Sequence, residues 1–202
     1  GAAGGSIASV IGTGAGTLTK SGTGTWTLSG SNTFTGATSV SDGTLALSGS
    51  GTISTSSGVT TSGSGVFSIT GASSDITITS LTGSSTATTG LVLGARTLTL
   101  SNASGTYSGV IDGTGGFALT TGTETLSGAN TYTGGTVLNG GTLKAGNARA
   151  FGTGSISVLA GAALDLNGQT MTSTGGLTLN GTGISSAGSL LNSSGTAATY
   201  AG

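Results

Sequence analysis

The chain has 202 residues, of which 43 are glycine, and it carries four basic and five acidic side chains for a net charge of −1. So few basic residues exclude a surface that neutralises phosphates, and nucleic acid is therefore not expected as a partner. The absence of histidine and cysteine excludes a Ser-His-Asp triad, a cysteine nucleophile and the usual zinc ligands.

Short apolar–polar–apolar triplets recur along the chain, and each is typical of a very short half-buried strand. In chain order, the apolar pairs are Trp26 and Leu28, Leu45 and Leu47, Phe67 and Ile69, Ile76 and Ile78, Leu91 and Leu93, Leu98 and Leu100, Phe117 and Leu119, Ile156 and Val158, Leu164 and Leu166, and Leu177 and Leu179. Glycine-rich turn signals separate the pairs, and no window has the sustained period of an amphipathic helix. With a mean hydropathy of +0.30, the pattern predicts an all-β protein and not a disordered linker.

The apolar pairs also recur at a longer interval of about 20 residues. Leu28 and Leu47 are 19 residues apart, as are Leu98 and Phe117; Leu47, Ile69 and Leu91 follow at intervals of 22; Leu143 and Leu164, like Ile156 and Leu177, differ by 21. This is the length of one solenoid coil, in which neighbouring coils bury each other's apolar residues. We therefore predict one continuous right-handed parallel β-helix, a β-solenoid with coils of about 20 residues, over residues 1–202. An antiparallel sandwich or barrel also has short strands and glycine turns, but it does not explain this recurrence.

Threonine and asparagine are expected to hold successive coils together without charge. Threonine suits the outer face of stacked strands, where its hydroxyl can bond the threonine of the next coil. Asn32, Asn130, Asn167 and Asn180 are expected in turns, because asparagine tolerates a left-handed φ and its amide can bond neighbouring coils. We interpret these asparagines as structural and not as ligands.

One stretch of the chain is repeated at an offset of 98 residues. Residues 27–45 read TLSGSNTFTGATSVSDGTL and residues 125–143 read TLSGANTYTGGTVLNGGTL, with twelve of the nineteen positions identical. The flanks add LTKSG before the first copy and SGVI followed by GTGG before the second. In this combination the two copies closely resemble the autotransporter-associated β-strand repeat, which is found in the passenger regions of bacterial type V secreted proteins.

The resemblance implies a parallel β-helix that is displayed on a bacterial surface or released from it, as in adhesins and in biofilm or aggregation factors. The related copies lie near residues 10–47 and 106–145. Because the chain begins and ends within the repeat pattern, we expect either a section of a longer repetitive polypeptide or a unit whose ends stack on copies of itself. The expected location is extracellular or on the bacterial cell surface.

The remaining candidates for chemistry are the five carboxylates, Asp42, Asp75, Asp112, Glu124 and Asp165. Carboxylate pairs that cleave polysaccharides lie about 5 to 10 Å apart, but no two of these five are separated by one coil. Glu124 and Asp165 are two coils apart, and Asp165 should point outward between two apolar residues. Glu124 takes the place of Trp26 in the first copy, and we expect it at the first position of a strand, where its side chain reaches water. The sequence therefore predicts no catalytic, cofactor-binding or metal-ligating residues and no cofactor.

Three functions remain open. The leading interpretation is a non-enzymatic structural or adhesive protein of the bacterial cell surface or of an extracellular filament. A ligand-specific adhesin module is the alternative, although neither a long loop nor an exposed aromatic cluster interrupts the repeat. A threonine-array ice-binding protein is less favoured, because the Thr-x-Thr units do not keep a constant place in the coil.

The expected partners are further coils of the same kind, through end-to-end self-association or continuation into further repeats, and other cell surfaces or matrix. Membrane insertion by this segment is not expected, because no apolar run approaches the ~20 residues of a membrane-spanning helix.

Overall fold

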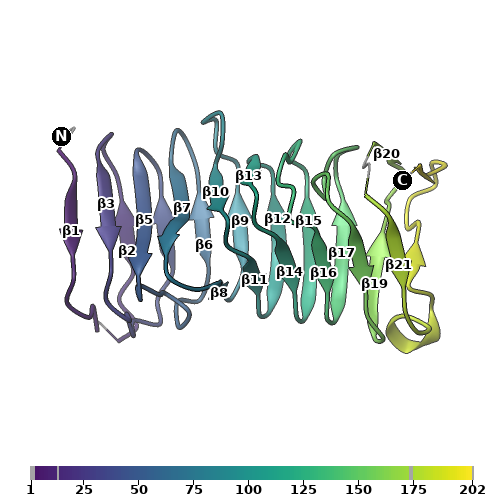
Figure 1. Ribbon diagram of the computed structural model, residues 1–202, viewed down its shortest axis with the longest axis horizontal. Helices are drawn as coiled ribbons and strands as arrows, with labels where there is room; N and C mark the ends of the chain where they lie inside the picture. Colours follow the sequence, from purple (N-terminus) through teal and green to yellow (C-terminus); the bar gives the residue numbers. More distant parts are fainter. Residues whose placement is uncertain (1–2, 13, 173–174, 202) are drawn as a thin grey trace.

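The computed structural model describes residues 3–12, 14–172 and 175–201 of the chain. These residues form an elongated stack of coils, with the two ends of the chain at opposite ends of the stack (Figure 1). The chain follows three faces as it coils, and strands of successive coils pair in parallel on each face. Residues 1–2, 13, 173–174 and 202 of the predicted solenoid lie outside this description.

One face carries strands along almost the whole stack, and we call its nine paired strands the long sheet. Its strands are β2 (Leu18–Lys20), β4 (Thr38–Val40), β6 (Val59–Thr61), β9 (Leu81–Gly83), β12 (Ala103–Tyr107), β15 (Gly122–Leu126), β17 (Gly141–Ala145), β19 (Ala162–Asp165) and β22 (Leu190–Leu191). Most of them have only three to five residues, because the chain must turn three times in each coil.

The other two faces carry paired strands over different stretches of the chain, which overlap in the middle. The amino-terminal sheet contains β1 (Gly5–Ile7), β3 (Thr25–Leu28), β5 (Thr44–Gly49), β7 (Val66–Ala72), β10 (Leu91–Gly94) and β13 (Ile111–Gly113). The carboxy-terminal sheet contains β8 (Ile76–Ile78), β11 (Leu98–Leu100), β14 (Phe117–Leu119), β16 (Thr136–Leu138), β18 (Ile156–Val158) and β21 (Leu177–Leu179). Segments without a named strand cross a face elsewhere, as residues 29–37 and 127–135 do. Near the C-terminus, β20 (Thr170–Met171) pairs with β23 (Thr199–Tyr200), and η1 (Ile184–Ser186) is a short 3-10 helix.

The register between coils confirms most of the predicted stacking. The confirmed pairs are Leu28 with Leu47, Leu98 with Phe117, Leu143 with Leu164, and Ile156 with Leu177. The predicted stacking of Leu91 on Ile69 is wrong, because Leu91 pairs with Phe67 across a coil lengthened by the loop of residues 84–90. All strand pairs of the described residues are parallel, so the parallel β-helix is confirmed and the antiparallel alternatives are wrong.

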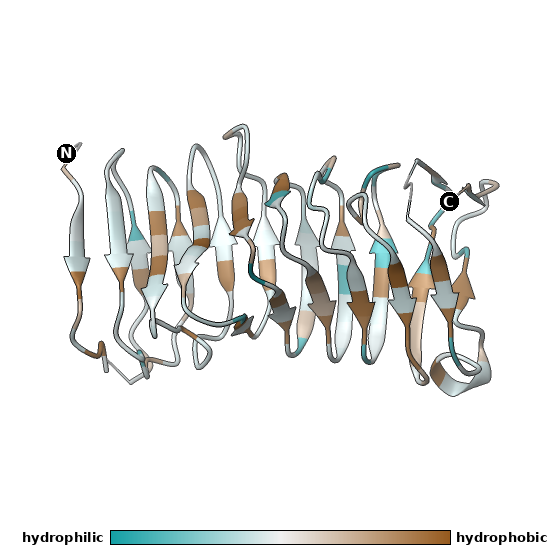
Figure 2. Cartoon of the chain, in the orientation of Figure 1, coloured by the Kyte–Doolittle hydropathy of each residue, from teal (hydrophilic) through white to brown (hydrophobic). Residues whose placement is uncertain are grey.

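Apolar side chains from all three faces form one core that runs along the stack. Inward residues such as Val40, Leu81 and Leu126 are fully buried, and residues between them on the same strands face outward. Figure 2 shows the brown apolar positions on the strands, whereas strongly hydrophilic teal is confined to a few positions. Because one coil cannot bury its own apolar residues, the stacking of coils supplies the hydrophobic stabilisation.

The glycine of the closing GTL motif has the same conformation in both copies. Gly43 has a φ of 61° and Gly141 a φ of 72°, a region that side-chain-bearing residues rarely adopt. A Cβ added to Gly43 would collide with the carbonyl oxygen of Gly22, and one added to Gly141 with that of Gly122. Only glycine therefore allows these turns to stack directly on the preceding coil.

Hydroxyl side chains line the outer side of the long sheet in a single column. The column runs through Thr19, Ser39, Thr60, Thr82, Thr106 and Thr125, on six successive strands. The Oγ1 atoms of Thr60 and Thr82 lie 2.8 Å apart, which confirms the expected hydrogen bond between threonines of neighbouring coils. The Thr-x-Thr units do not form one array, because those containing Thr19, Thr27 and Thr77 lie on three different faces. No helix of the described residues is long and apolar enough to cross a membrane.

Candidate functional site

The two sequence copies occupy different faces of the solenoid. In the first copy, the first two residues of the TLSG segment are the last two residues of strand β3 in the amino-terminal sheet. The closing GTL leads into β5 of the same sheet. In the second copy, the same segments belong to β15 and β17 of the long sheet. An offset of 98 residues is four coils of about 21 residues plus two faces of about seven residues each. On a coil with three faces, this places the second copy one face short of five complete coils, so the motif is rotated by one face.

The asparagine of each copy points inward and joins three successive coils. Asn32 accepts a hydrogen bond from the backbone N–H of Ile11 (2.9 Å), and its amide nitrogen donates to the carbonyl oxygen of Thr52 (3.0 Å). Asn130 likewise accepts from the N–H of Ile111 (2.9 Å) and donates to the carbonyl of Ala150 (2.5 Å). The side chains thus bond backbone N–H and C=O groups of the coils on either side, which helps to satisfy these buried groups.

The prediction that all four asparagines lie in left-handed turns is only partly confirmed. Asn167 has a φ of 48° and donates to the carbonyl of Ala145 in the preceding coil (2.8 Å). Asn180 donates to the carbonyl of Val158 (3.3 Å). Asn32 and Asn130 are buried, and neither they nor Asn180 have a positive φ, so for these three the expected left-handed turn is wrong. The structural interpretation agrees with the backbone contacts of all four.

The aromatic residue two positions after the asparagine fills the core in both copies. Phe34 is 1% exposed and Tyr132 is fully buried. Tyr132 packs against Phe117, with ring centroids 6.3 Å apart, and its hydroxyl shares a 2.6 Å hydrogen bond with Thr136. Phe34 has no hydroxyl, and the corresponding threonine, Thr38, shares a 3.0 Å bond with the hydroxyl of Ser56 instead.

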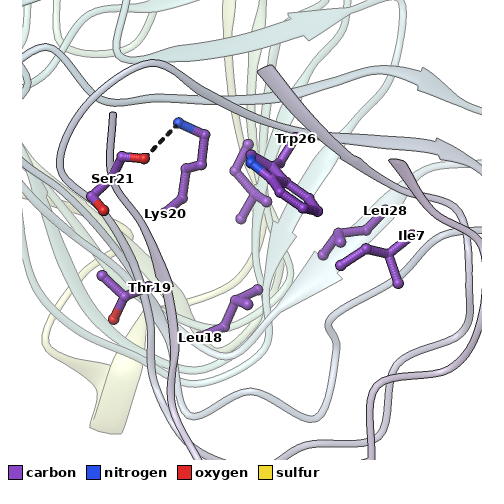
Figure 3. Close-up of a pocket in the computed structure, with 8 residues that line it drawn as sticks. Ile7, Leu18, Thr19, Lys20, Ser21, Trp26 and Leu28 are labelled. Carbon is purple, nitrogen blue, oxygen red and sulfur yellow. Dashed lines mark hydrogen bonds between the residues drawn. The ribbon is translucent and has the colours of Figure 1, made fainter. Parts of the chain in front are cut away.

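Lys20 points into the end of the core and is only 4% exposed. Its ammonium donates to the carbonyls of Gly22 (2.6 Å) and Asp42 (2.9 Å), and more weakly to that of Ser21 (3.5 Å, Figure 3). The turn between β2 and β3 spans residues 21–24, whereas the turn between β14 and β15 in the second copy has only residues 120–121. The lysine therefore satisfies the carbonyls of a longer turn that the second copy lacks.

A cavity of about 290 Å³ lies beside Lys20 at the amino-terminal end of the stack. The large side chains of Trp26 and Lys20 line it, and Ile7, Leu18 and Leu28 form its apolar walls (Figure 3). Trp26 is 40% exposed here, although it faces the same way as buried Leu28 two residues later. The cavity is thus the open end of the hydrophobic core and not a cleft in a side of the solenoid.

Three of the five carboxylates accept hydrogen bonds from the following coil. Asp42 accepts hydrogen bonds from the side chain of Ser64 and from the N–H of Gly43, and these bonds lower its pKa. The Oδ1 atom of Asp75 accepts from the N–H of Thr97 (2.9 Å), and that of Asp112 from the Oγ1 of Thr131 (2.8 Å). Each aspartate therefore connects two coils.

Asp165 lies on the outer side of the long sheet, as predicted, beneath the segment around Ser193. Lys144 donates to the Oγ of Ser193 (2.9 Å), and this hydroxyl donates to the Oδ2 of Asp165 (2.6 Å). The ammonium and Oδ2 are 3.7 Å apart. Burial raises the pKa of Asp165, but the hydrogen bonds from Ser193 and Asn167, together with Lys144, outweigh it and lower the pKa overall. Because its pKa is lowered, the carboxylate of Asp165 is a weak base, and it does not activate the Ser193 hydroxyl as a nucleophile.

The expectation that Glu124 reaches water is wrong. β15 begins two residues before it, at Gly122, so Glu124 is the third of five strand residues and is fully buried. Neither carboxylate oxygen has a hydrogen-bond partner among the described residues. Burial raises the pKa of Glu124 to about 8. Asp165 lies on the opposite side of the same sheet, since its neighbour Leu164 is the residue in line with Glu124, so the two carboxylates cannot act together.

The polar groups do not converge on one centre. Within the described residues, no three acidic, histidine or cysteine side chains come together in a way that could hold a metal ion. What recurs in both copies is the inward asparagine, the core aromatic residue and the glycine turn.

Two segments of the chain, residues 18–47 and 121–145, match the family model of the passenger-associated-transport-repeat. The chain carries two passenger-associated-transport-repeats. Together they cover about a quarter of its length. Comparison with curated proteins and comparison with solved structures each found no match.

The positions shared by the two passenger-associated-transport-repeats are those that satisfy or shape the backbone. Asn32 and Asn130 bridge coils, and Gly43 and Gly141 allow the closing turns. The repeats differ at other positions, such as Trp26 and Glu124. The repeat and the β-solenoid fold together fit a segment of an autotransporter passenger.

Proposed function

We propose that this chain is a non-enzymatic structural and adhesive segment of a bacterial passenger that acts at the cell surface or in an extracellular filament. The observation that carries the proposal is the state of the five carboxylates. Asp42, Asp75 and Asp112 accept hydrogen bonds from the next coil, Asp165 is paired with Lys144, and Glu124 is sealed in the core. No carboxylate pair is left to act as acid and base on a bound substrate.

The direct test is a panel of uronate, glucan and peptide substrates incubated with the purified chain. We expect no turnover above that of a heat-denatured control. Hydrolysis that Glu124→Gln or Asp165→Asn abolishes, with the fold intact by circular dichroism, would overturn the proposal.

The adhesive part of the proposal is supported by the hydroxyl column of the long sheet. Its six side chains carry no charge and repeat at the strand spacing of about 4.8 Å, which suits contact with neutral, hydroxyl-rich matrix. Thr60 lies in the middle of the column and is exposed. Binding of the chain to neutral polysaccharide beads should fall with Thr60→Glu and remain with Thr77→Glu on another face. Equal retention of both variants would remove this support.

The two ends of the stack support association with further coils. At one end Ile7, Leu18 and Trp26 are only partly buried, and at the other Leu179 and Leu190 are 42% and 38% exposed. Among the described strands, those at the two edges of the long sheet, β2 and β22, each have one side without a paired strand. Such an edge pairs with any matching strand, so we propose that the ends stack on further solenoid coils, from the same polypeptide or from another copy.

Sedimentation of the 202-residue chain separates these two sources, because stacking of copies makes the mass rise with concentration. Leu190→Lys should abolish that rise, whereas Val137→Lys should not, since Val137 is equally exposed (38%) but lies on a side of the stack. A strictly monomeric chain would leave covalent continuation as the source of the coils. A monomer with a ligand bound in a side cleft would favour the ligand-specific adhesin module instead.

A further inference from the structure

Glu124 lies in an inward column of the long sheet whose other members are apolar or small. In register, it is flanked by Gly105 on β12 and by Leu143 on β17, and Leu164 follows on β19. It is fully buried, and both of its oxygens lack a hydrogen-bond donor within the part of the chain that the structure describes. An ionised carboxylate in such a place would be held by nothing that offsets its lost hydration.

None of the elements around β15 brings a positive charge to this carboxylate. On β17, Lys144 alternates with Leu143 and pairs with Asp165 on the outer side of the sheet. On β12, Tyr107 accepts a hydrogen bond from Thr61 (3.4 Å), and β14 and β16 contain no titratable residue.

Other titratable groups near Glu124 are hydrogen-bonded to other residues. Burial raises the pKa of Tyr107 to about 12 and raises that of Tyr132 as well, so both phenols stay neutral. Tyr132 bonds Thr136, and the exposed carboxylate of Asp112 bonds Thr131. The surroundings therefore accept Glu124 only as a neutral acid.

We propose that folding of the second repeat takes up one proton at Glu124, which makes the coils around β15 a pH-dependent weak point of the solenoid. The coils close around the protonated carboxyl and open locally as it ionises. The first repeat has no such group, because Trp26 stands at the corresponding position. This proposal does not depend on the proposed function, since it concerns only folding and local opening.

The direction of the pH dependence follows from the two states. The ordinary pKa of 4.5 applies to the unfolded chain, and burial raises the pKa in the folded chain to about 8. Between these values, the folded chain holds a proton that the unfolded chain has released, so stability falls as pH rises. The unfolding equilibrium constant should rise about tenfold per pH unit in this window and level off on either side of it.

The test is urea unfolding of the whole chain, followed by circular dichroism between pH 5 and pH 8. Wild type should lose stability steadily over this range, whereas Glu124→Gln, which keeps the shape but cannot ionise, should remove that dependence. Asp165→Asn is the matched control: it removes a carboxylate whose pKa is lowered, so it should leave the slope between pH 5 and pH 8 unchanged. An identical slope in wild type and Glu124→Gln would overturn the proposal.

Amide hydrogen exchange locates the effect. After correction for the intrinsic pH dependence, protection of β15 and β17 should fall as pH rises, while that of β3 and β5 stays constant. A loss confined to the first repeat, or uniform along the chain, would contradict a weak point at Glu124. If Glu124→Gln fails to fold, Glu124→Leu serves the same comparison, because leucine continues the column of Leu143 and Leu164.

Discussion

The two repeats share one motif, yet they meet different surroundings. In the first, the position before Thr27 is Trp26, which is 40% exposed at the open end of the core. In the second, it is Glu124, which is fully buried in the middle of the stack. Each residue pairs in register with a glycine on the preceding coil and a leucine on the next coil. The partners are Gly5 and Leu45 for Trp26, and Gly105 and Leu143 for Glu124.

The comparison shows which information the motif carries. Identical residues reproduce the same backbone contacts although the motif is rotated by one face, so the motif specifies the shape of a coil and not the sheet that the coil joins. The position of a residue along the stack then decides whether it is exposed or buried. A substitution that is harmless in one repeat can for this reason be costly in the other.

The largest effect should come from placing a second carboxylate in the core, this time in the first repeat. Leu47 is fully buried and pairs with Leu28, so Leu47→Asp leaves an unpaired buried charge that costs about 4 kcal/mol at neutral pH. Urea unfolding followed by circular dichroism measures the loss. Ala46→Asp, at the outward position of the same strand, is the control and should cost less than about 1 kcal/mol. Equal losses would mean that the register of β5 is wrong.

A smaller loss should follow removal of the asparagine bridges. Asn130→Ala leaves the N–H of Ile111 and the carbonyl of Ala150 without their partner in a buried site, which costs about 3 kcal/mol. Asn32→Ala should cost about 1 to 2 kcal/mol, because its bonds to Ile11 and Thr52 are only partly buried and water can replace them.

The control for both is Asn180→Ala, since Asn180 is exposed and makes a single 3.3 Å bond. It should change the free energy of unfolding by less than about 0.5 kcal/mol. If Asn32→Ala proves more harmful than Asn130→Ala, burial does not determine the cost of these bridges.

Much of the fold was predictable because apolar spacing reports stacking directly. Leu143 and Leu164 differ by one coil and pair as expected. The predicted partner of Leu91 was wrong because a loop changed the length of one coil. Spacing between apolar residues does not distinguish a longer loop from a shifted strand. The rotation of the repeats was not evident from the sequence, because 98 residues also correspond to five coils of about 20 residues.

The polar interior was less predictable. Asparagine is typical of turns, and nothing in the local sequence shows that Asn32 and Asn130 bond backbone groups some 20 residues away on either side. Glu124 was misplaced because the strand began two residues earlier than its apolar pattern indicated. Its burial depends on the coils before and after it, which a local pattern does not describe.

Replacing Trp26 by the residue of the second repeat tests the comparison with a smaller expected loss of stability. Trp26→Glu gives the first repeat the residue of the second, but at the open end the carboxylate reaches water and shares the cavity with Lys20. We expect a loss of about 1 kcal/mol from reduced apolar contact. It should add no pH dependence between pH 5 and pH 8 to that of wild type. An added tenfold change in the unfolding constant per pH unit would show that this end is as closed as the middle of the stack.

The smallest effect concerns the aromatic residue, where each repeat has its own way to satisfy the neighbouring threonine. Tyr132→Phe makes the second repeat like the first and removes the 2.6 Å bond to Thr136, but Thr136 still donates to the carbonyl of Phe151 (3.2 Å). The loss should therefore be only about 0.5 kcal/mol. Phe34→Tyr should not yield the reverse gain, because Ser56 already occupies the partner site of Thr38 and the added hydroxyl must displace it. Thermal unfolding of both variants decides the matter: a stabilised Phe34→Tyr would mean that the two repeats are interchangeable at this position, contrary to the comparison.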